Sequence, residues 1–298
     1  MPTPSTDLPE RLTTPDELLR WSDGCHGARL SVGMVPTMGA LHAGHRALID
    51  RAVAENDRVV VTIFVNPAQF GPTEDFNRYP RKLEADLETV AAAGAHAVFV
   101  PSVETMYPPG LTTRVHIDEV LGGRLEGAMR PGHFDGVALV VTKLLVAGRP
   151  DRAYFGQKDA QQCAVVRHLA RDLDTGTEIV VCPTVRDTDG LAISSRNVYL
   201  SPSDREAARS IPTGLAAAMA KFDAGQRDAG LLTTIVRASI EAAGLAVDYV
   251  AVVEAEGFSE VETAVPTNQI VVAARIGGTR LIDVVRLGVD TAPVGRGA

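Results

Sequence analysis

Short apolar runs alternate with amphipathic segments of helical length through roughly the first 185 residues. The apolar runs predict buried strands at residues 30–35, 58–65, 96–101, 152–156 and 177–183. Between them, apolar residues recur at helical spacing, as at Leu83, Leu87 and Val90, and predict helices over residues 44–56, 81–94, 136–147 and 159–172. Helices that alternate with almost wholly apolar strands are typical of a parallel sheet covered on both faces.

From about residue 186 the order changes, and helices are followed by strands. The pattern predicts helices over residues 201–225 and 226–244, and strands over residues 247–255, 269–276 and 279–287. Only Gly277 and Gly278 separate the last two strands, which indicates a tight hairpin. We therefore expect a Rossmann-like, doubly wound α/β domain over residues 1–186 and a smaller α+β lid domain over residues 187–298.

Composition excludes several classes of partner. The chain of 298 residues is 45% hydrophobic and 22% charged, which fits a soluble globular protein. Its formal net charge of -8 argues against a general nucleic-acid binder or a binder of anionic membranes. Cys25, Cys163 and Cys182 have neither metal-site nor redox spacing, so we expect reduced, buried thiols.

Location in the cytoplasm is the expectation from two segments. The first residues, MPTPSTDLPE, are polar and proline-rich, and they resemble neither a signal peptide nor a transit peptide. The longest apolar stretch, residues 136–148, is too short to cross a bilayer and contains Lys143.

The segment VPTMGALHAGH, residues 35–45, joins the first predicted strand to the first predicted helix. Gly39 and Gly44 allow the backbone to approach a ligand closely, and the helix N-terminus favours a phosphate. His42 and His45 are three positions apart, so both imidazoles can face that point and stabilise charge on phosphate oxygens. A zinc site is less favoured, because the glutamate of H-E-x-x-H is absent.

Three further polar motifs lie at the ends of other predicted elements. FVNPAQFG, residues 64–71, carries the neutral amides of Asn66 and Gln69, which suit hydroxyl and carboxylate groups. YFGQKDAQQ, residues 154–162, carries Lys158 as a point charge for phosphates. GLAISSRN, residues 190–197, offers two serines and an arginine that can hold a triphosphate. Taken alone, each motif is also compatible with an ordinary turn, a helix cap or an exposed polar linker.

Together the four motifs resemble the pantothenate synthetase (pantoate–β-alanine ligase) family, a branch of the H-x-G-H nucleotidyltransferases that include class I aminoacyl-tRNA synthetases. The resemblance covers residues 28–290. It implies ATP-dependent condensation of (R)-pantoate with β-alanine to pantothenate, a coenzyme A precursor, through pantoyl adenylate with release of pyrophosphate and AMP. It also implies a homodimer, Mg²⁺ that accompanies ATP as substrate, and no covalently bound cofactor.

The resemblance assigns the motif residues to roles. Charge stabilisation during catalysis is assigned to His42, His45, Lys158, Ser194, Ser195 and Arg196, with His45 as general acid by analogy. ATP binding is assigned to these six and to Met38, Gly39, Ala40, Leu41, Ala43, Gly44, Gly156, Gln157, Asp159, Val185 and Ile193. Pantoate and β-alanine binding is assigned to Asn66, Gln69 and Gln162. The stretch RPGHFDG, residues 130–136, places Arg130 and His133 in a glycine-flanked loop, which fits the lining of the pantoate pocket and an exposed loop equally well.

Two positions depart from the family pattern. Gln157 stands where the family usually has glutamate. Asp86 matches a position associated with Mg²⁺, but the neighbouring position, acidic in some members, is Ala85. Glu84, Asp86 and Glu88 can also be explained as solvated charges on a helix face.

Two other functions stay open at this point. One is a nucleotidyltransferase that acts on a phosphate ester, although the amides of Asn66, Gln69 and Gln162 favour a small hydroxy acid. The other is a nucleotide sensor, which would bind ATP without releasing pyrophosphate.

Overall fold

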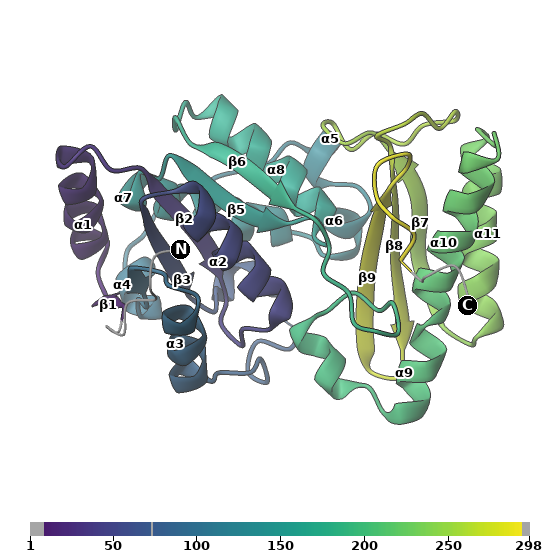
Figure 1. The fold of residues 1–298 in the computed structure, drawn as a ribbon, viewed down its shortest axis with the longest axis horizontal. Helices are drawn as coiled ribbons and strands as arrows, with labels where there is room; N and C mark the ends of the chain where they lie inside the picture. The colour runs from purple at the N-terminus through teal and green to yellow at the C-terminus, as the bar shows by residue number, and fades with distance from the viewer. Residues whose placement is uncertain (1–8, 73, 294–298) are drawn as a thin grey trace. The chain divides into compact units, whose positions relative to one another are not determined.

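The computed structural model describes residues 9–72 and 74–293 (Figure 1). The first part of its fold is a six-stranded, wholly parallel sheet with strand order β1-β4-β3-β2-β5-β6. Its strands are β1 Glu10–Leu12, β2 Val32–Thr37, β3 Arg58–Ile63, β4 Ala97–Phe99, β5 Arg152–Gly156 and β6 Glu178–Cys182. The predicted doubly wound α/β fold is confirmed. Because β3, β2 and β5 are neighbours and parallel, their carboxyl ends lie at one edge of the sheet.

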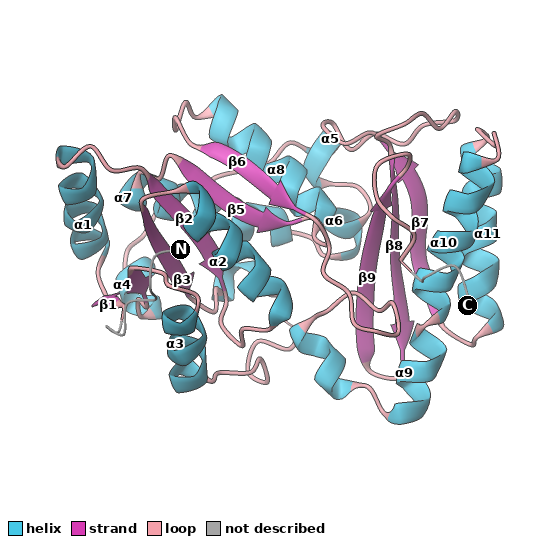
Figure 2. Ribbon diagram, viewed as in Figure 1, coloured by secondary structure: helices cyan, strands magenta, loops and turns pink. Residues whose placement is uncertain are grey.

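Helices cover both faces of this sheet (Figure 2). On one face, α2 Ala43–Glu55 and α3 Leu83–Ala92 form a core with Val35 and its neighbours. The preceding residue, Met34, points to the other face, where it lies beside Gly148 of α7 His133–Gly148 and near α1 Pro15–Gly27. The short helices η1 Pro67–Gln69 and α4 Val103–Met106 follow β3 and β4, and α8 Ala160–Asp172 leads from β5 to β6.

The sequence did not predict β1 or α1. Strand β1 has only three residues, and only Leu12 among them is buried, so the apolar pattern of the other strands is missing. Helix α1 does carry a start signal, because Thr14 and Glu17 form a capping box around Pro15.

The second part of the fold is a three-stranded antiparallel sheet of β7 Ala246–Val253, β8 Gln269–Ile276 and β9 Thr279–Arg286. One face packs against α10 Ser210–Asp223 and α11 Ala229–Ala242. The tight hairpin at Gly277 and Gly278 is confirmed. The single helix expected over 201–225 is wrong: α9 Pro202–Ala208 ends before α10 begins, because Pro212 has no N–H for the carbonyl of Ala208.

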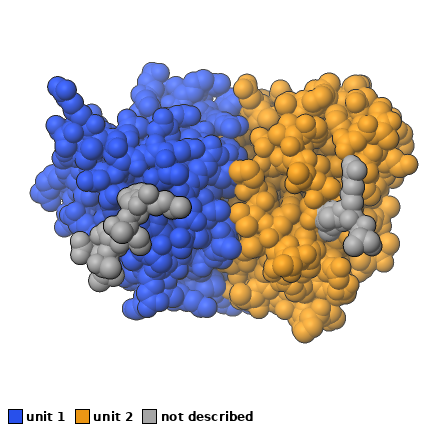
Figure 3. Space-filling view, in the orientation of Figure 1, with its two compact units in different colours: residues 1–118, 130–156, 165–182 blue, residues 119–129, 157–164, 183–298 orange. Residues whose placement is uncertain are grey.

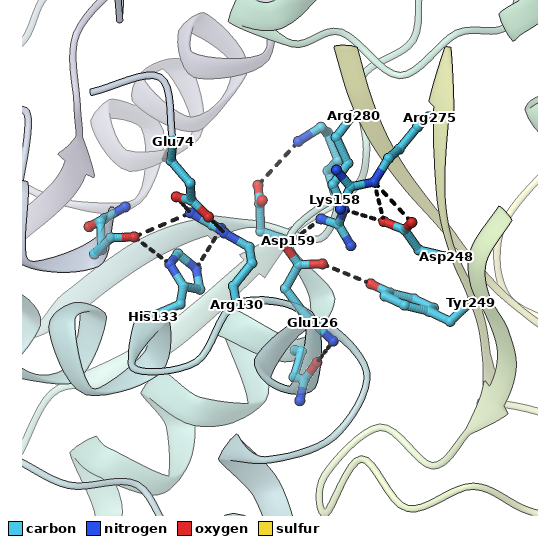
Figure 4. Close-up of polar contacts among 12 residues, drawn as sticks. Glu74, Glu126, Arg130, His133, Lys158, Asp159, Asp248, Tyr249, Arg275 and Arg280 are labelled. Carbon is cyan, nitrogen blue, oxygen red and sulfur yellow. Dashed lines mark hydrogen bonds and ion pairs between the residues drawn. The ribbon is translucent and has the colours of Figure 1, made fainter. Parts of the chain in front are cut away.

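The other face of this small sheet meets α6 Glu126–Met129 through charged groups (Figure 4). The Glu126 carboxylate accepts hydrogen bonds from Arg280 Nη1 at 2.7 Å and from Tyr249 Oη at 3.1 Å. Asp248 accepts from Arg280 Nε at 2.6 Å and from Arg275 Nε at 3.0 Å. Gln161 of α8 accepts a hydrogen bond from the Glu126 N–H at 3.0 Å. Its Nε2 donates to the carbonyl of Leu121 in α5 Glu119–Gly122 and to that of Arg124 in the loop that follows.

The chain divides into two compact units that interleave along the sequence (Figure 3). Unit 1 contains residues 1–118, 130–156 and 165–182, and unit 2 contains residues 119–129, 157–164 and 183–298. The proposed division into contiguous domains at residue 186 stays a prediction. Within the described residues, no helix is both long and apolar enough to span a membrane. Residues 1–8, on which the expectation about leader peptides rests, lie outside the described part.

Asp248→Asn should destabilise the protein by about 1 to 3 kcal/mol at pH 7, because it removes the charge that Arg280 and Arg275 contact. Burial raises the pKa of Asp248, but the hydrogen bonds and charges of these arginines outweigh it and hold the pKa below the usual 3.8. This stabilisation is therefore complete above that value and is lost as the pH falls through the lower folded pKa. Chemical unfolding of both proteins at pH 7 and pH 3 measures the difference.

Asp23→Asn is the matched control, because the Asp23–Arg149 pair is exposed and such pairs contribute little. An equal loss of stability from Asp248→Asn at both pH values would contradict the assignment.

Candidate active site

The loop that follows β2 has an unusual backbone. Gly39 and Ala40 both have positive φ angles, +79° and +51°. Left-handed backbone is strained at Ala40, which has a Cβ, so other groups must hold this conformation in place. Thr37 supplies one of them: its Oγ1 accepts the Gly39 N–H at 3.2 Å and donates to the carbonyl of Thr62 in the neighbouring strand at 2.6 Å.

Asp86, in the first turn of α3, supplies the other acceptors that hold this loop. Its Oδ2 accepts the N–H of Ala40 at 2.9 Å, and its Oδ1 accepts the N–H of Leu41 at 2.7 Å. The side chain is buried, with a residue exposure of 3%. Successive N–H groups in this conformation form a cavity for an anion, and the carboxylate of the chain itself fills it. A Cβ at position 39 would lie 2.9 Å from Asp86 Oδ2, so a side chain there would displace this carboxylate oxygen as well as strain the left-handed backbone.

This geometry changes the interpretation of Asp86. Its explanation as a solvated charge is wrong, whereas Glu84 and Glu88 are exposed as that explanation requires. Both carboxylate oxygens are engaged by the loop, so the donor set around Asp86 fits a backbone anchor better than a metal site. In the described part of the chain, no group of three or more His, Cys, Asp or Glu residues could hold a metal ion. Contact between Asp86 and Mg²⁺ stays a prediction.

The two histidines begin the helix together. His42 is the N-cap of α2, and its Nδ1 accepts the N–H of Gly44 at 3.2 Å. His45 Nδ1 in turn accepts the N–H of His42 at 3.4 Å, and the rings stack with centroids 4.1 Å apart. Because a backbone N–H can only donate, Nδ1 of each neutral ring is an acceptor and Nε2 carries the proton. The pair thus has two imidazole N–H groups of the kind that donate hydrogen bonds to phosphate oxygens.

The same contacts correct one detail. The sequence led us to expect unpaired N–H groups at this helix N-terminus for a phosphate. The Gly44 N–H donates to His42 Nδ1, so this group is not one of the unpaired donors that were expected.

The turn after β3 brings two predicted sites together. Gln69 Nε2 lies 3.3 Å from Sδ of Met38, in the loop that follows the adjacent strand β2. Gln69 Oε1 accepts from Asn66 Nδ2 at 2.9 Å. Asn66 is only 1% exposed and also bonds to Gly136, Ala68 and Tyr107. Asn66 therefore shapes the turn, and Gln69 is the amide that the turn carries toward the β2 loop.

Arg130 and His133 are also placed against this turn. Each donates to the main-chain carbonyl of Gln69, Arg130 from Nη2 at 3.2 Å and His133 from Nδ1 at 2.8 Å. They act on the backbone of a predicted substrate-binding residue.

In unit 2, the residues after β5 have separate roles. Gln157 is 2% exposed, and its Nε2 donates to Asp290 Oδ2 at 2.6 Å. An amide suits this position because a carboxylate there would face another carboxylate. Lys158 pairs with Asp159 at 3.5 Å with its side chain 19% exposed, and Gln162 is half-buried on α8.

The GLAISSRN segment is not an exposed linker, because Arg186 and Ala192 form an antiparallel bridge and residues 190–197 are buried or half-buried. The Ile193 N–H donates to the Val185 carbonyl at 3.0 Å, so these two predicted ATP contacts are neighbours. Arg186 forms two hydrogen bonds with the buried carboxylate of Asp283 in β9, at 2.7 and 2.9 Å. Ser194 caps the short helix η2 Ser195–Tyr199.

Several residues of these sites were not identified from the sequence, namely Glu74, Tyr107, Arg186, Asp283 and the buried role of Asp86. Burial raises the pKa of Tyr107, so its hydroxyl stays a donor to Asn66. None of them lies in a motif, and their partners are distant in sequence.

Comparison with known proteins gives one consistent result. The model of the family described as "Pantoate-beta-alanine ligase" matches residues 10–286. A pantothenate synthetase from Roseiflexus sp. (strain RS-1) is 52% identical over 254 residues, which is 85% of this chain and 91% of that protein. One from Myxococcus xanthus is 48% identical over 283 residues, which is 94% of this chain and 97% of that protein.

Solved structures agree. Pantothenate synthetase from Thermus thermophilus has a TM-score of 0.87 and 44% identity, with 93% of this chain and 99% of that chain covered. Pantoate-beta-alanine ligase from Francisella tularensis, complexed with beta-gamma ATP and beta-alanine, has a TM-score of 0.75 and 32% identity, with 93% and 97% covered.

Asp86→Asn should lower both the free energy of unfolding, by about 1 to 3 kcal/mol, and the turnover number. An amide has one acceptor oxygen, so its NH₂ group would face one of the two loop N–H groups. Thermal unfolding and steady-state rates measure the two effects, with the exposed Asp223→Asn as control. Full recovery of turnover on adding Mg²⁺ would show instead that Asp86 acts on the metal.

Proposed function

The chain belongs to the pantoate-beta-alanine ligase family and is a ligase, and we propose that it condenses (R)-pantoate with β-alanine through pantoyl adenylate. The observation that carries this proposal is the stacked His42–His45 pair at the start of α2. The same loop contains Met38, whose sulfur lies 3.3 Å from the amide of Gln69 in the turn after the adjacent strand β3. A phosphate-stabilising group beside a neutral polar pocket suits the adenylation of a small hydroxy acid.

In the first step, the pantoate carboxylate attacks the α-phosphorus of Mg·ATP in line, and the bond to pyrophosphate breaks. His42 and His45 donate from Nε2 to the oxygens on which negative charge increases. Gln69 and Gln162 hold the hydroxyl and carboxylate groups of pantoate, which need orientation rather than a fixed opposing charge.

In the second step, the amine of β-alanine attacks the carbonyl carbon of the mixed anhydride. The C–N bond forms, the bond to the AMP phosphate breaks, and pantothenate and AMP leave. No covalent bond to the protein is required, so positioning and preorganised donors must supply the rate enhancement.

Lys158, Ser194, Ser195 and Arg196 of unit 2 are proposed to hold the β- and γ-phosphates and the leaving pyrophosphate. Water must be excluded while the adenylate exists, because acyl phosphates hydrolyse, and closure of the smaller domain would provide this. The homodimer, the cytoplasmic location and the Mg²⁺ requirement stay predictions.

The alternative acceptor, a phosphate ester, receives less support. Such a substrate needs basic groups in the second pocket, whereas Gln69 is surrounded by Asn66 and Met38, and Arg130 is paired with Glu74. A nucleotide sensor would differ from the proposed ligase in one measurable property, because it would bind ATP without releasing pyrophosphate.

With purified protein, ATP, Mg²⁺ and (R)-pantoate should release pyrophosphate, and AMP and pantothenate should appear once β-alanine is added. Coupled detection of pyrophosphate and chromatography of the nucleotides measure these products. If pyrophosphate release depends on an acceptor other than pantoate, the assignment of pantoate as substrate is refuted. If no acceptor leads to pyrophosphate release, the result favours the nucleotide sensor.

His45→Ala and Lys158→Ala should each reduce turnover by about 10² or more, because each removes a partner of transition-state charge. Both variants should stay folded, with a modest loss of stability in His45→Ala because the ring belongs to the cap of α2. His168→Ala and Lys221→Ala, at helix positions outside the four motifs, are matched controls with normal turnover expected. Near-normal turnover in His45→Ala and Lys158→Ala would exclude the charge-stabilising role.

A further inference from the structure

Glu74, Arg130 and His133 form a polar cluster (Figure 4). Arg130 and His133 both donate to the main-chain carbonyl of Gln69, and Glu74 pairs with Arg130. Arg130 precedes α7, His133 is its first residue, and Glu74 comes from the loop that follows η1. His133 is buried with 8% exposure, and the side chains of Arg130 and Glu74 are 17% and 24% exposed. We call these three residues the Gln69 clamp.

The charged pair in the clamp is bidentate. Arg130 Nε and Nη2 each donate to one oxygen of Glu74, both at 2.7 Å. Burial raises the pKa of Glu74, but the hydrogen bonds and charge of Arg130 outweigh it and keep the pKa below its usual value. Glu74 is therefore a carboxylate at neutral pH, and it fixes the plane of the guanidinium group that contacts the Gln69 carbonyl.

His133 completes the arrangement in one tautomer. Its Nδ1 faces the Gln69 carbonyl, which can only accept, so Nδ1 carries the proton. Its Nε2 lies 3.0 Å from Arg130 Nη1, which can only donate, so Nε2 is unprotonated. The neutral ring thus links the guanidinium group to the carbonyl, and all three groups hold one another in orientation.

The rest of the turn is fixed by the next turn of the same helix, α7. A Cβ on Gly136 of α7 would lie 2.1 Å from the Ala68 carbonyl oxygen, so helix and turn are in direct backbone contact. Asn66 Nδ2 donates to the Gly136 carbonyl at 3.0 Å. Residues 66–68 are thereby anchored, and the Gln69 carbonyl is the point at which the chain leaves the anchored turn. Holding this carbonyl fixes the backbone of Gln69, from which the side chain extends.

We propose that Glu74, Arg130 and His133 are positioning residues, which hold the Gln69 amide in the orientation that binds pantoate. This inference rests on the proposed function, because it gives Gln69 that role. Four of the five N–H groups of Arg130 donate to acceptors in the protein, namely the one on Nε, one on Nη1 and both on Nη2. Arg130 therefore acts through Gln69, and a direct contact with substrate is not needed to explain it.

Glu74→Gln tests the clamp, because it keeps the side-chain size and removes the charge that orients Arg130. The KM for pantoate should rise by about tenfold, whereas the KM for ATP stays within about twofold. Glu178→Gln is the matched control, since Glu178 pairs with Arg152 near the opposite ends of the strands and its side chain is 65% exposed. It should leave both constants unchanged.

The decisive readout is a double-mutant cycle. In a Gln69→Ala background the amide is gone, so adding Glu74→Gln should change the KM for pantoate no further. An unchanged KM in the single variant would overturn the proposal. An equal increase with and without the Gln69 side chain would also overturn it, because the cluster would then act on structure alone.

A readout that does not depend on activity separates this proposal from the proposed function. Hydrogen exchange of the peptide over residues 66–72 should be faster in Glu74→Gln than in the unaltered protein and in Glu178→Gln. If the unaltered protein releases no pantoate-dependent pyrophosphate, the proposed function fails, and faster exchange would still support the clamp on Gln69. Unchanged exchange would overturn the clamp in either case.

Discussion

A buried carboxylate from one helix holds the loop that begins another. Asp86 of α3 accepts the N–H groups of Ala40 and Leu41 and so stabilises a left-handed backbone that costs about 1 to 3 kcal/mol per strained residue. The conformation of this loop fixes where α2 starts. That start in turn fixes the tautomers of His42 and His45, because their Nδ1 atoms cap the first N–H groups of the helix.

Much of the fold could be predicted from the sequence, because its strongest signals are local. Buried parallel strands need apolar residues on both faces, and β2, β3 and β5 carry them in continuous runs. The two-glycine hairpin between β8 and β9 is equally local. Strand β1 has too few buried residues to give a pattern, and the break before α10 depends on Pro212 within an otherwise continuous helical periodicity.

The motifs of the candidate site could be predicted from the sequence, but the residues that hold those motifs in place could not. The glycines and histidines of residues 39–45 lie together in sequence, so their spacing carries information. Arg130 lies 56 residues from Glu74, and Arg280 lies 154 residues from Glu126. Such ion pairs depend on which surfaces the fold brings together, so the sequence could single out Arg130 but could not predict that Glu74 is its partner. The same holds for Gln157, whose amide matches Asp290 only in the folded chain.

The interleaving of the two units has a practical consequence for anyone who wishes to study them apart. A fragment that starts at residue 183 would lack residues 119–129 and 157–164, which belong to the same unit. In that fragment Arg280 would lose Glu126, and Asp290 would lose Gln157. Arg280 would keep Asp248 and Asp290 would keep Arg286, but each would lack one of its polar partners. Fusing the two short segments back through designed linkers is the better route to an isolated, foldable piece.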